Sequence, residues 1–402
     1  MRPPVRVSGI GIVSVFGTSH DAFRDALLDG RTAIAPITAF DTSGCRTTLT
    51  AAMSGFDASA WIPPMKLRRL DRTGVYAVAA TRLALEDAGV RIPDGGDDGI
   101  GVVLGSATAG GQSTQVFLEA MLRGGPTGAP ALLFDSTVGN AAAGLTALEF
   151  KLRGPNITLS HKEASGLAAI VGGVDLLREG RATSLFAGGI DALYETVFKG
   201  HDRFKVMSRE RAFSRRLAPF DADRSGFVMG EGGFGLWLEP DNGAPGRRGD
   251  LLGVAASGAA VTLNAWPHDP EPLARTMSQA LDECGLAPAD VHVVYASANA
   301  THALDAAEAR AIACVFGDAP VVTSLKGAIG EGGMSGAAAC AAALLCGAVG
   351  EVPPIAGLVE PAPEAAVLRL ARRRTRAPGP VAVVNSFASG GALFSAVLRV
   401  VA

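Results

Sequence analysis

A carboxylate stands at a turn that would suit a nucleophile. The stretch NITLSHKEASGLAAIVGGVDLL, residues 156–177, has the pattern of a strand that turns sharply at residues 160–164 and continues as an apolar helix, and the turn carries Glu163. Residues that open a helix directly after a buried strand face unpaired backbone N–H groups and the positive end of the helix dipole. Such a turn favours a nucleophile or an anion. Glu163 is neither a thiol nor a hydroxyl, so the sequence predicts an anion at this position.

Other short motifs give little support for nucleotide, metal or serine-hydrolase chemistry. Gly9 and Gly11 follow a strand-like run, but no third glycine follows at the dinucleotide-binding spacing and no helix opens there. The GGMSGAA segment around Ser335 is one residue short of a serine nucleophile elbow, and no strand leads directly into it. No phosphate-binding loop, HExxH pair or EF-hand loop occurs. We therefore expect no metal ion and no cofactor.

Strand-like and helix-like runs alternate along the whole chain, and these elements must position the turn. Strands are expected at residues 5–14, 99–107, 157–160, 184–191, 251–261, 291–299, 321–325, 380–387 and 392–401, and helices at residues 20–29, 73–89, 112–122, 139–153, 164–178, 271–284, 303–315 and 335–348. Such alternation predicts an α/β protein with a mostly parallel sheet that is covered by helices.

The two halves of the chain resemble one another in the order of their segments. GVVLGSAT at residues 101–108 and VVYASANAT at residues 293–301 are each followed by a helix-like run, and NITLSHKEASGLAAI resembles PVVTSLKGAIGEGGMSGAAA. We interpret this as an internal duplication, with its boundary in the proline- and glycine-rich stretch at residues 239–250. The predicted halves are residues 1–248 and 249–402, with one buried sheet in each half and shared helices between them.

The composition is that of a globular protein of the cytoplasm. Of the 402 residues, 48% are hydrophobic and 19% are charged, and the formal net charge is -3. This near-neutral balance, without a long tract of Lys and Arg, argues against nucleic acid or an anionic membrane as a partner. The five cysteines form no CxxC pair, and no apolar run has the length of a membrane span. Small molecules or proteins are the expected partners.

Several segments together resemble the condensing enzymes of the beta-ketoacyl synthase family. They are VSGIGIVSVFG at 7–17, GPNITLSHKEASGLAAIVGGVDLLREGRAT at 154–183, AGGIDAL at 187–193, PFDADRSGFVMGEGGFGLWLE at 219–239, DAAEARAI at 305–312, SLKGAIGE at 324–331 and NSFASGG at 385–391. The resemblance covers nearly the whole chain. It implies the duplicated thiolase fold, with five layers in the order α-β-α-β-α.

The resemblance also implies where catalytic residues would stand. An active member takes an acyl group onto a cysteine at a helix N-terminus, and uses two histidines and a lysine to decarboxylate a malonyl unit. In this chain the cysteine position holds Glu163, and the lysine is retained as Lys326. The two histidine positions hold Ser297 and Glu331. Because a carboxylate forms no useful thioester intermediate, the resemblance implies a degenerate site with no catalytic residue.

The gate of the site departs from the family pattern as well. Its motif keeps Phe387, but the second phenylalanine of the family is Ser389 here. These departures resemble chain length factors, the non-catalytic partners of ketosynthases in type II polyketide synthases, although those commonly carry glutamine at the position of Glu163. The resemblance implies that this chain forms a heterodimer with a ketosynthase alpha subunit. Only that heterodimer would have beta-ketoacyl synthase activity, which is an acyltransferase activity. The strand at residues 155–160 is expected to pair with the equivalent strand of the partner.

The tunnel of such a heterodimer would receive the chain carried by an acyl carrier protein, and its depth would limit the chain length. In chain length factors the helix predicted here at residues 112–122 lines the tunnel. Gln112, Gln115 and Glu119 share one face of it, at spacings of i, i+3 and i+7, and Val116 lies opposite. These are our four candidate tunnel residues. A polar tunnel wall would fit a linear or reduced, polyene-like product. The alternative is that this polar face of the helix is exposed to solvent and lines no tunnel.

Other interpretations stay open at this point. Glu163 is either a structural anion or a participant in residual malonyl decarboxylation. As a structural anion it would cap a helix and could in addition pair with Lys162, Lys326 or a partner residue. Lys326 either stabilises the pocket through Glu331 or Glu163, or catalyses. The whole chain could instead be a free-standing ketosynthase-fold enzyme, such as a malonyl-carrier-protein decarboxylase or an acyltransferase. A binding protein for an acyl ligand is the third possibility.

Overall fold

Two groups of strands with the same pattern of directions form the centre of the computed structural model, which describes residues 2–67, 70–244 and 247–401. The first group has the order β1 (Val5–Val13), β8 (Gly232–Pro240), β6 (Ser184–Asp191), β4 (Ile100–Gly105) and β5 (Asn156–Leu159). The second has the order β9 (Gly249–Gly258), β16 (Ala392–Val400), β15 (Val381–Phe387), β10 (Val293–Tyr295) and β11 (Val321–Thr323), with β13 (Arg369–Leu370) beyond it. In each group the first two pairings are antiparallel and the next two are parallel.

This repeated pattern is the duplication that the sequence predicted, but the expectation of a mostly parallel sheet was wrong. Each group is mixed, because one strand, β8 or β16, runs antiparallel to both of its neighbours. The two groups also join edge to edge, where Val5 pairs with Leu251 and Val7 with Gly249, so that one 11-stranded sheet results. The division at residue 248 stays a prediction, and residues 245 and 246 of the predicted joint lie outside the described residues.

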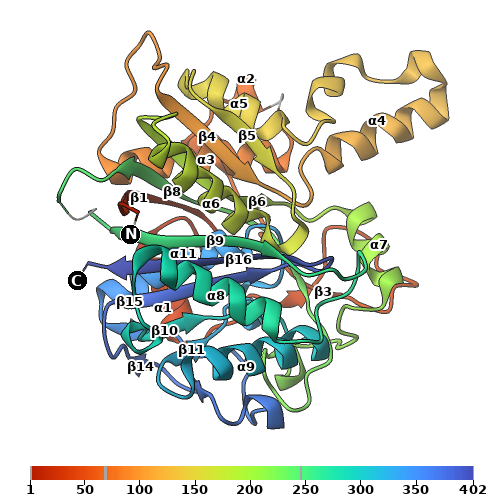
Figure 1. The fold of residues 1–402 in the computed structure, drawn as a ribbon. Helices are drawn as coiled ribbons and strands as arrows, with labels where there is room; N and C mark the ends of the chain where they lie inside the picture. The colour runs from red at the N-terminus through yellow and green to blue at the C-terminus, as the bar shows by residue number, and fades with distance from the viewer. Residues whose placement is uncertain (1, 68–69, 245–246, 402) are drawn as a thin grey trace.

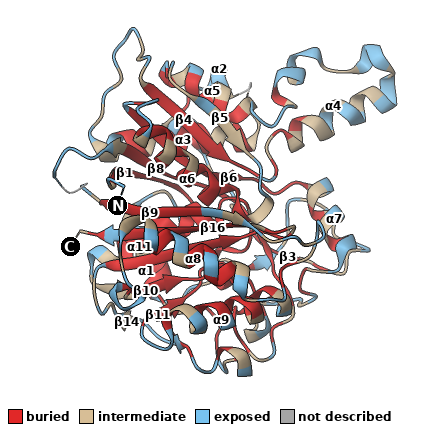
Figure 2. Ribbon diagram, viewed as in Figure 1, coloured by how far each residue is buried: buried red, intermediate tan, exposed pale blue. Residues whose placement is uncertain are grey.

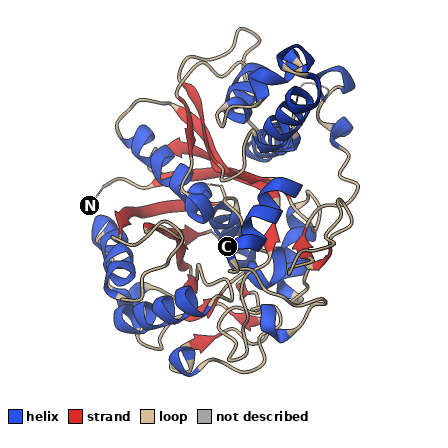
Figure 3. Ribbon diagram, turned by 90° about the vertical axis from the view of Figure 1, so that its right-hand side faces the viewer, coloured by secondary structure: helices blue, strands red, loops and turns tan. Residues whose placement is uncertain are grey.

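Helices cover both groups of strands and separate them into layers. α3 (Arg72–Ala88) and α5 (Ala141–Phe150) pack on the first group, while α8 (Glu271–Cys284), with α9 (His302–Phe316) beside it, packs on the second. α6 (Ser165–Arg178) and α11 (Ser335–Ala348) contact strands of both groups and so form the middle layer (Figure 1). The result is the five-layered thiolase arrangement, which a second view shows as strands enclosed by helices (Figure 3).

Small side chains make the middle layer possible. α11 reads SGAAACAAALLCGA, and nearly all of it is buried (Figure 2). The two groups of strands can approach one helix layer closely when its side chains are no larger than alanine over most of its length. The helix predicted at residues 335–348 is therefore the centre of the core. No helix among the described residues has both the length and the hydrophobicity needed to cross a membrane.

The remaining elements lie at the edges of these layers. They are the helices α1 (His20–Leu28), α2 (Pro64–Leu67), α4 (Gly111–Gly124), α7 (Glu195–Phe204) and α10 (Lys326–Ile329), and the short strands β2 (Ala35–Pro36), β3 (Leu49–Ala51), β7 (Met229–Gly230), β12 (Glu351–Val352) and β14 (Thr375–Arg376). The sequence did not predict α7 or β8. The predicted helix at 139–153 is shorter, because Lys151 takes a left-handed conformation, with φ 56°, and ends α5.

Candidate functional site

The turn that the sequence singled out is present and tight. β5 ends at Leu159, a short 3-10 turn covers Lys162–Ala164, and α6 begins at Ser165. Lys162 has φ 49°, a left-handed conformation that L-residues rarely adopt. The Ser165 hydroxyl stabilises the turn, since it accepts from the backbone N–H of His161 at 2.9 Å and donates to the carbonyl of Lys162 at 2.7 Å.

Close backbone packing fixes the start of α6 against the neighbouring elements. A Cβ atom on Gly105 of β4 would lie 1.9 Å from the carbonyl oxygen of Ser165. A Cβ atom on Gly166 would lie 2.7 Å from the carbonyl oxygen of Gly333, which accepts the Gly166 N–H at 2.7 Å. Only glycine permits these approaches. They bring Glu163 next to the loop that follows α10 and carries Glu331.

The carboxylate of Glu163 is bound by the loop that follows β15 and was predicted to form the gate. It accepts hydrogen bonds from the backbone N–H of Ser389 at 3.1 Å and from the Ser389 hydroxyl at 3.0 Å. The prediction that Glu163 caps a helix was wrong, because α6 has no side-chain cap. Glu163 also pairs with neither Lys162 nor Lys326, and no described cation lies within ion-pair distance of it. Burial, together with the Glu331 carboxylate, raises the pKa of Glu163.

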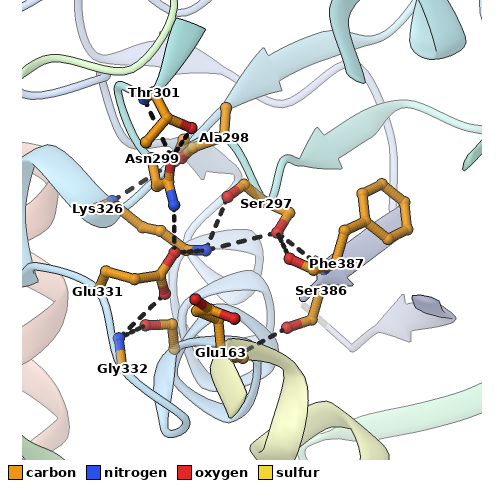
Figure 4. Close-up of polar contacts among 12 residues, drawn as sticks. Glu163, Ser297, Ala298, Asn299, Thr301, Lys326, Glu331, Gly332, Ser386 and Phe387 are labelled. Carbon is orange, nitrogen blue, oxygen red and sulfur yellow. Dashed lines mark hydrogen bonds and ion pairs between the residues drawn. The ribbon is translucent and has the colours of Figure 1, made fainter. Parts of the chain in front are cut away.

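Lys326 and Glu331 form a buried ion pair. The Nζ atom of Lys326 lies 2.6 Å from Oε2 of Glu331 and donates to the backbone carbonyl of Ser297 at 2.7 Å. Glu331 also accepts from the side-chain amide of Asn299 at 2.9 Å and from the N–H of Gly332 at 3.0 Å. The side chains converge from separate loops on one space (Figure 4). Of the alternatives for Lys326, the pairing with Glu331 is therefore the one observed.

Ser297 at the other histidine position is part of the structural network. Its hydroxyl accepts from the backbone N–H of Phe387 at 2.9 Å, and its own N–H donates to Glu308 at 2.9 Å. Glu308 also accepts from the side-chain amide of Asn385 at 3.0 Å, and burial raises the pKa of Glu308 to about 7. The sequence reasoning missed Glu308 and Asn385, although both lie in the segments that carried the family resemblance.

A cavity of about 350 Å³ opens beside Glu163. Glu163, Glu331 and Ser389 line it, whereas Ser297 and Lys326 lie behind it. Four further lining side chains, His201, Phe204, Phe227 and Trp266, were missed by the sequence reasoning. The apolar spacing of ETVFKGHDRF, which buries one side of α7, was the available signal for the first two. Among the described residues, no group of three or more His, Cys, Asp or Glu could hold a metal ion.

The candidate tunnel residues lie elsewhere, on α4, which extends away from the body of the molecule (Figure 1). Gln112 accepts the backbone N–H of Arg72 at 3.3 Å. Gln115 accepts from Thr196 at 3.0 Å and donates to Glu119 at 3.0 Å, and Val116 is 47% exposed. None of the four predicted residues lines the cavity beside Glu163. Their place in a tunnel therefore stays a prediction, which depends on a partner subunit.

Comparison with known proteins identifies the family. Residues 2–243 match the N-terminal domain of beta-ketoacyl synthases, and residues 249–359 match the C-terminal domain. The chain is 31% identical over 398 residues to 3-oxoacyl-[acyl-carrier-protein] synthase 2 of Synechocystis, which covers 96% of this chain and 95% of that protein. It is 33% identical over 370 residues to the tetracenomycin polyketide synthase ketoacyl synthase beta subunit of Streptomyces glaucescens, with 90% and 89% covered.

Solved structures agree with this assignment. The ishigamide ketosynthase/chain length factor superposes with a TM-score of 0.91 at 27% sequence identity, and the alignment covers 100% of both chains. The fold, the two domain matches and the full-length relatives lead to one conclusion: the chain belongs to the beta-ketoacyl synthase family.

Proposed function

We propose that this chain is a chain length factor: a non-catalytic subunit that pairs with a ketosynthase and shapes the tunnel for a growing polyketide chain. The observation that carries the proposal is Glu163 at the nucleophile position, hydrogen-bonded to Ser389. No cysteine lines the described cavity, so no thiol is available there for an acyl group. Lys326, which an active member would use, is neutralised by Glu331 at 2.6 Å.

The surface around α4 supports a protein partner. It carries apolar side chains that are between 43% and 96% exposed: Val116, Leu118, Leu122, Leu132, Phe134, Val138 and Leu148. A cluster of large exposed apolar residues is typical of an interaction site. These residues lie on α4, α5 and the chain between them, beside β5, which is the edge strand of the large sheet. A ketosynthase alpha subunit that extends the sheet at β5 would cover them.

The names of two similar proteins point in the same direction. One is a ketoacyl synthase beta subunit of a polyketide synthase, and another is a ketosynthase/chain length factor. The Synechocystis relative is a 3-oxoacyl synthase, which favours an enzyme, but this chain lacks the thiol that such chemistry needs. We infer that an acyl carrier protein delivers the growing chain to the cysteine of the partner. The distal end of that chain then enters the tunnel beside α4.

The test is reconstitution with a cognate ketosynthase that retains the catalytic cysteine. The pair should elute together and make polyketides from malonyl-loaded carrier protein, whereas this chain alone should neither condense malonyl units nor gain mass from an acyl thioester. A covalent acyl adduct on this chain would contradict the proposal. So would a stable monomer in the presence of that ketosynthase, because a partner of this type should bury the apolar surface around α4.

A further inference from the structure

The residues that line the cavity beside Glu163 differ from those expected in a degenerate catalytic pocket that binds no ligand. Its volume of about 350 Å³ falls in the range of small-molecule sites. Phe204, Phe227 and Trp266 contribute aromatic surface, and Met229 and Val206 contribute aliphatic surface. A degenerate pocket without a ligand would be expected to fill with larger side chains, because an empty apolar cavity costs stability. The cavity instead combines apolar walls with a charged end.

The charged groups at that end do not balance. Glu163, Glu331 and Asp191 line the cavity as carboxylates. Lys326 neutralises Glu331 at 2.6 Å, and Lys162 reaches the mouth, where its Nζ atom contacts Asn264 at 2.9 Å and Ser389 at 3.3 Å. The three carboxylates therefore outnumber the two ammonium groups by one.

The Asp191 carboxylate is satisfied by hydrogen bonds from the hydroxyls of Ser106 and Thr108 and from the backbone N–H groups of Ala107, Thr108 and Gly333. Glu163 has fewer contacts, all of them neutral, and therefore carries the imbalance. Ser389 supplies its hydrogen bonds through a backbone N–H and a hydroxyl, and no described cation lies within ion-pair distance of it. A carboxylate beside an apolar cavity and a second carboxylate takes up either a proton or a cation. The raised pKa of Glu163 agrees with this physical situation. One positive charge, delivered at the Glu163 side of the cavity, would complete the site.

The walls favour an organic cation over a bare metal ion. Aromatic rings attract ammonium groups through their π-systems, and three of them line this cavity. His201 donates its Nδ1–H to the carbonyl of Val197 at 2.9 Å, so that in the neutral ring Nε2 is an acceptor. The indole N–H of Trp266, which is only 5% exposed, finds no acceptor among the described residues.

We propose that this cavity binds a monocationic primary ammonium ligand with an apolar body, and that Glu163 is its counter-ion. The ammonium group would donate to the free lone pairs of the Glu163 carboxylate, and the apolar body would lie against Phe204, Phe227 and Trp266. This binding site is separate from the predicted tunnel on α4. It also does not depend on the chain length proposal, since either can fail while the other holds.

The experiment uses the purified full-length chain, alone and with its ketosynthase, and n-hexylamine as the probe. Calorimetric titration at pH 7.5 should show hexylammonium binding at least tenfold more tightly than 1-hexanol or hexanoate. Glu163→Gln, which preserves the shape and the Ser389 contacts but not the charge, should abolish that preference. Glu179→Gln removes an exposed carboxylate elsewhere and should leave it unchanged.

A second variant keeps the proposal falsifiable if the Gln variant folds poorly. Trp266→Leu should weaken hexylammonium several-fold more than hexanol, because it removes an aromatic wall without changing charge. Equal affinity for the amine and the alcohol would overturn the proposal. Potassium chloride that binds as tightly as hexylammonium in the same calorimetric titration would also overturn it, because that result would indicate a simple inorganic cation site.

Discussion

The Glu163 carboxylate and Ser389 hold the loop after β15 against the start of α6, through a backbone N–H at 3.1 Å and a hydroxyl at 3.0 Å. Both residues depart from the family pattern, and each departure accounts for the other. A phenylalanine at position 389 could donate only its backbone N–H, and a cysteine at position 163 would leave the Ser389 hydroxyl with a weak acceptor. Glu163 and Ser389 together form a polar contact between the start of α6 and the loop after β15.

Removal of the hydroxyl from that contact should have a modest cost. Ser389→Ala keeps the backbone hydrogen bond, so we expect a loss of about 1.5–3 kcal/mol, the range for hydrogen bonds to charged groups. Urea unfolding of the purified chain measures it. In the Glu163→Gln background the same substitution should cost less, because the acceptor is neutral. An equal cost in both backgrounds would mean that the charge of Glu163 contributes nothing to the contact.

The buried pair of Lys326 and Glu331 should respond strongly to the loss of one partner. Lys326→Met leaves Glu331 uncompensated beside Glu163, and we expect destabilisation of about 3–5 kcal/mol. The double variant Lys326→Met, Glu331→Leu should lose less than the single one, because no buried charge is left unpaired. Arg275→Met breaks an exposed pair with Glu271 and should cost at most about 1 kcal/mol. A single and a double variant of equal stability would argue against the buried pair.

Stability should also depend on pH through Glu308. Its pKa in the folded chain is about 7, above the usual range, so the stabilising contribution of the protonated form is complete at low pH. It is lost as the pH rises through about 7, by on the order of 3 kcal/mol in total. Glu308→Gln can keep the contacts to Ser297 and Asn385, and its unfolding free energy should fall less between pH 5 and pH 8.

The control for this pH dependence is Glu86→Gln, which neutralises an exposed carboxylate and should leave the pH profile of the wild type unchanged. Urea titrations at four pH values between 5 and 8 are sufficient. If the Glu308→Gln profile runs parallel to that of the wild type, Glu308 is ionised in the folded chain throughout the range.

The outer edge of β5 should be needed for pairing with the ketosynthase. The carbonyls of Pro155 and Leu159 accept hydrogen bonds from β4, so by alternation the N–H of Thr158 faces away from β4. Thr158→Pro removes that donor and should sharply lower the yield of heterodimer in co-purification, whereas Thr158→Ala keeps the N–H and should not. Circular dichroism establishes that the variant is folded. A normal heterodimer with Thr158→Pro would exclude sheet extension through β5.

Side-chain volume on α4 should set product length. Gln112→Trp or Gln115→Trp should shorten the products of the reconstituted pair by blocking the tunnel, and Gln112→Ala should lengthen them or broaden their distribution. Glu163→Ala should leave length unchanged, because its cavity is not lined by α4. Mass spectrometry of the products measures the chain length. Unchanged length in both tryptophan variants, with turnover lost in Glu163→Ala, would show that the tunnel assignment is wrong.

The sequence by itself determined the family and the duplicated fold. Local patterns sufficed for this, since strand and helix periodicity and the segment around Asp221 and Arg224 depend on near neighbours in the chain. The helices at 271–284 and 335–348 have the predicted bounds for the same reason. Strand directions did not follow, because β8 shows its role only when it is placed between β1 and β6.

Only the tertiary structure decided which partners the charged residues have. The sequence left Lys326 with two candidate carboxylates and Glu163 with several candidate contacts. The choice depends on side chains that are far apart in the sequence, since Glu163 and Ser389 are 226 positions apart. A buried charge is satisfied by whichever donor the fold brings within hydrogen-bonding distance, and for Glu163 that donor is Ser389 rather than a lysine. The aromatic cavity beside Glu163 has the same origin, because α7, β7 and distant loops form it together.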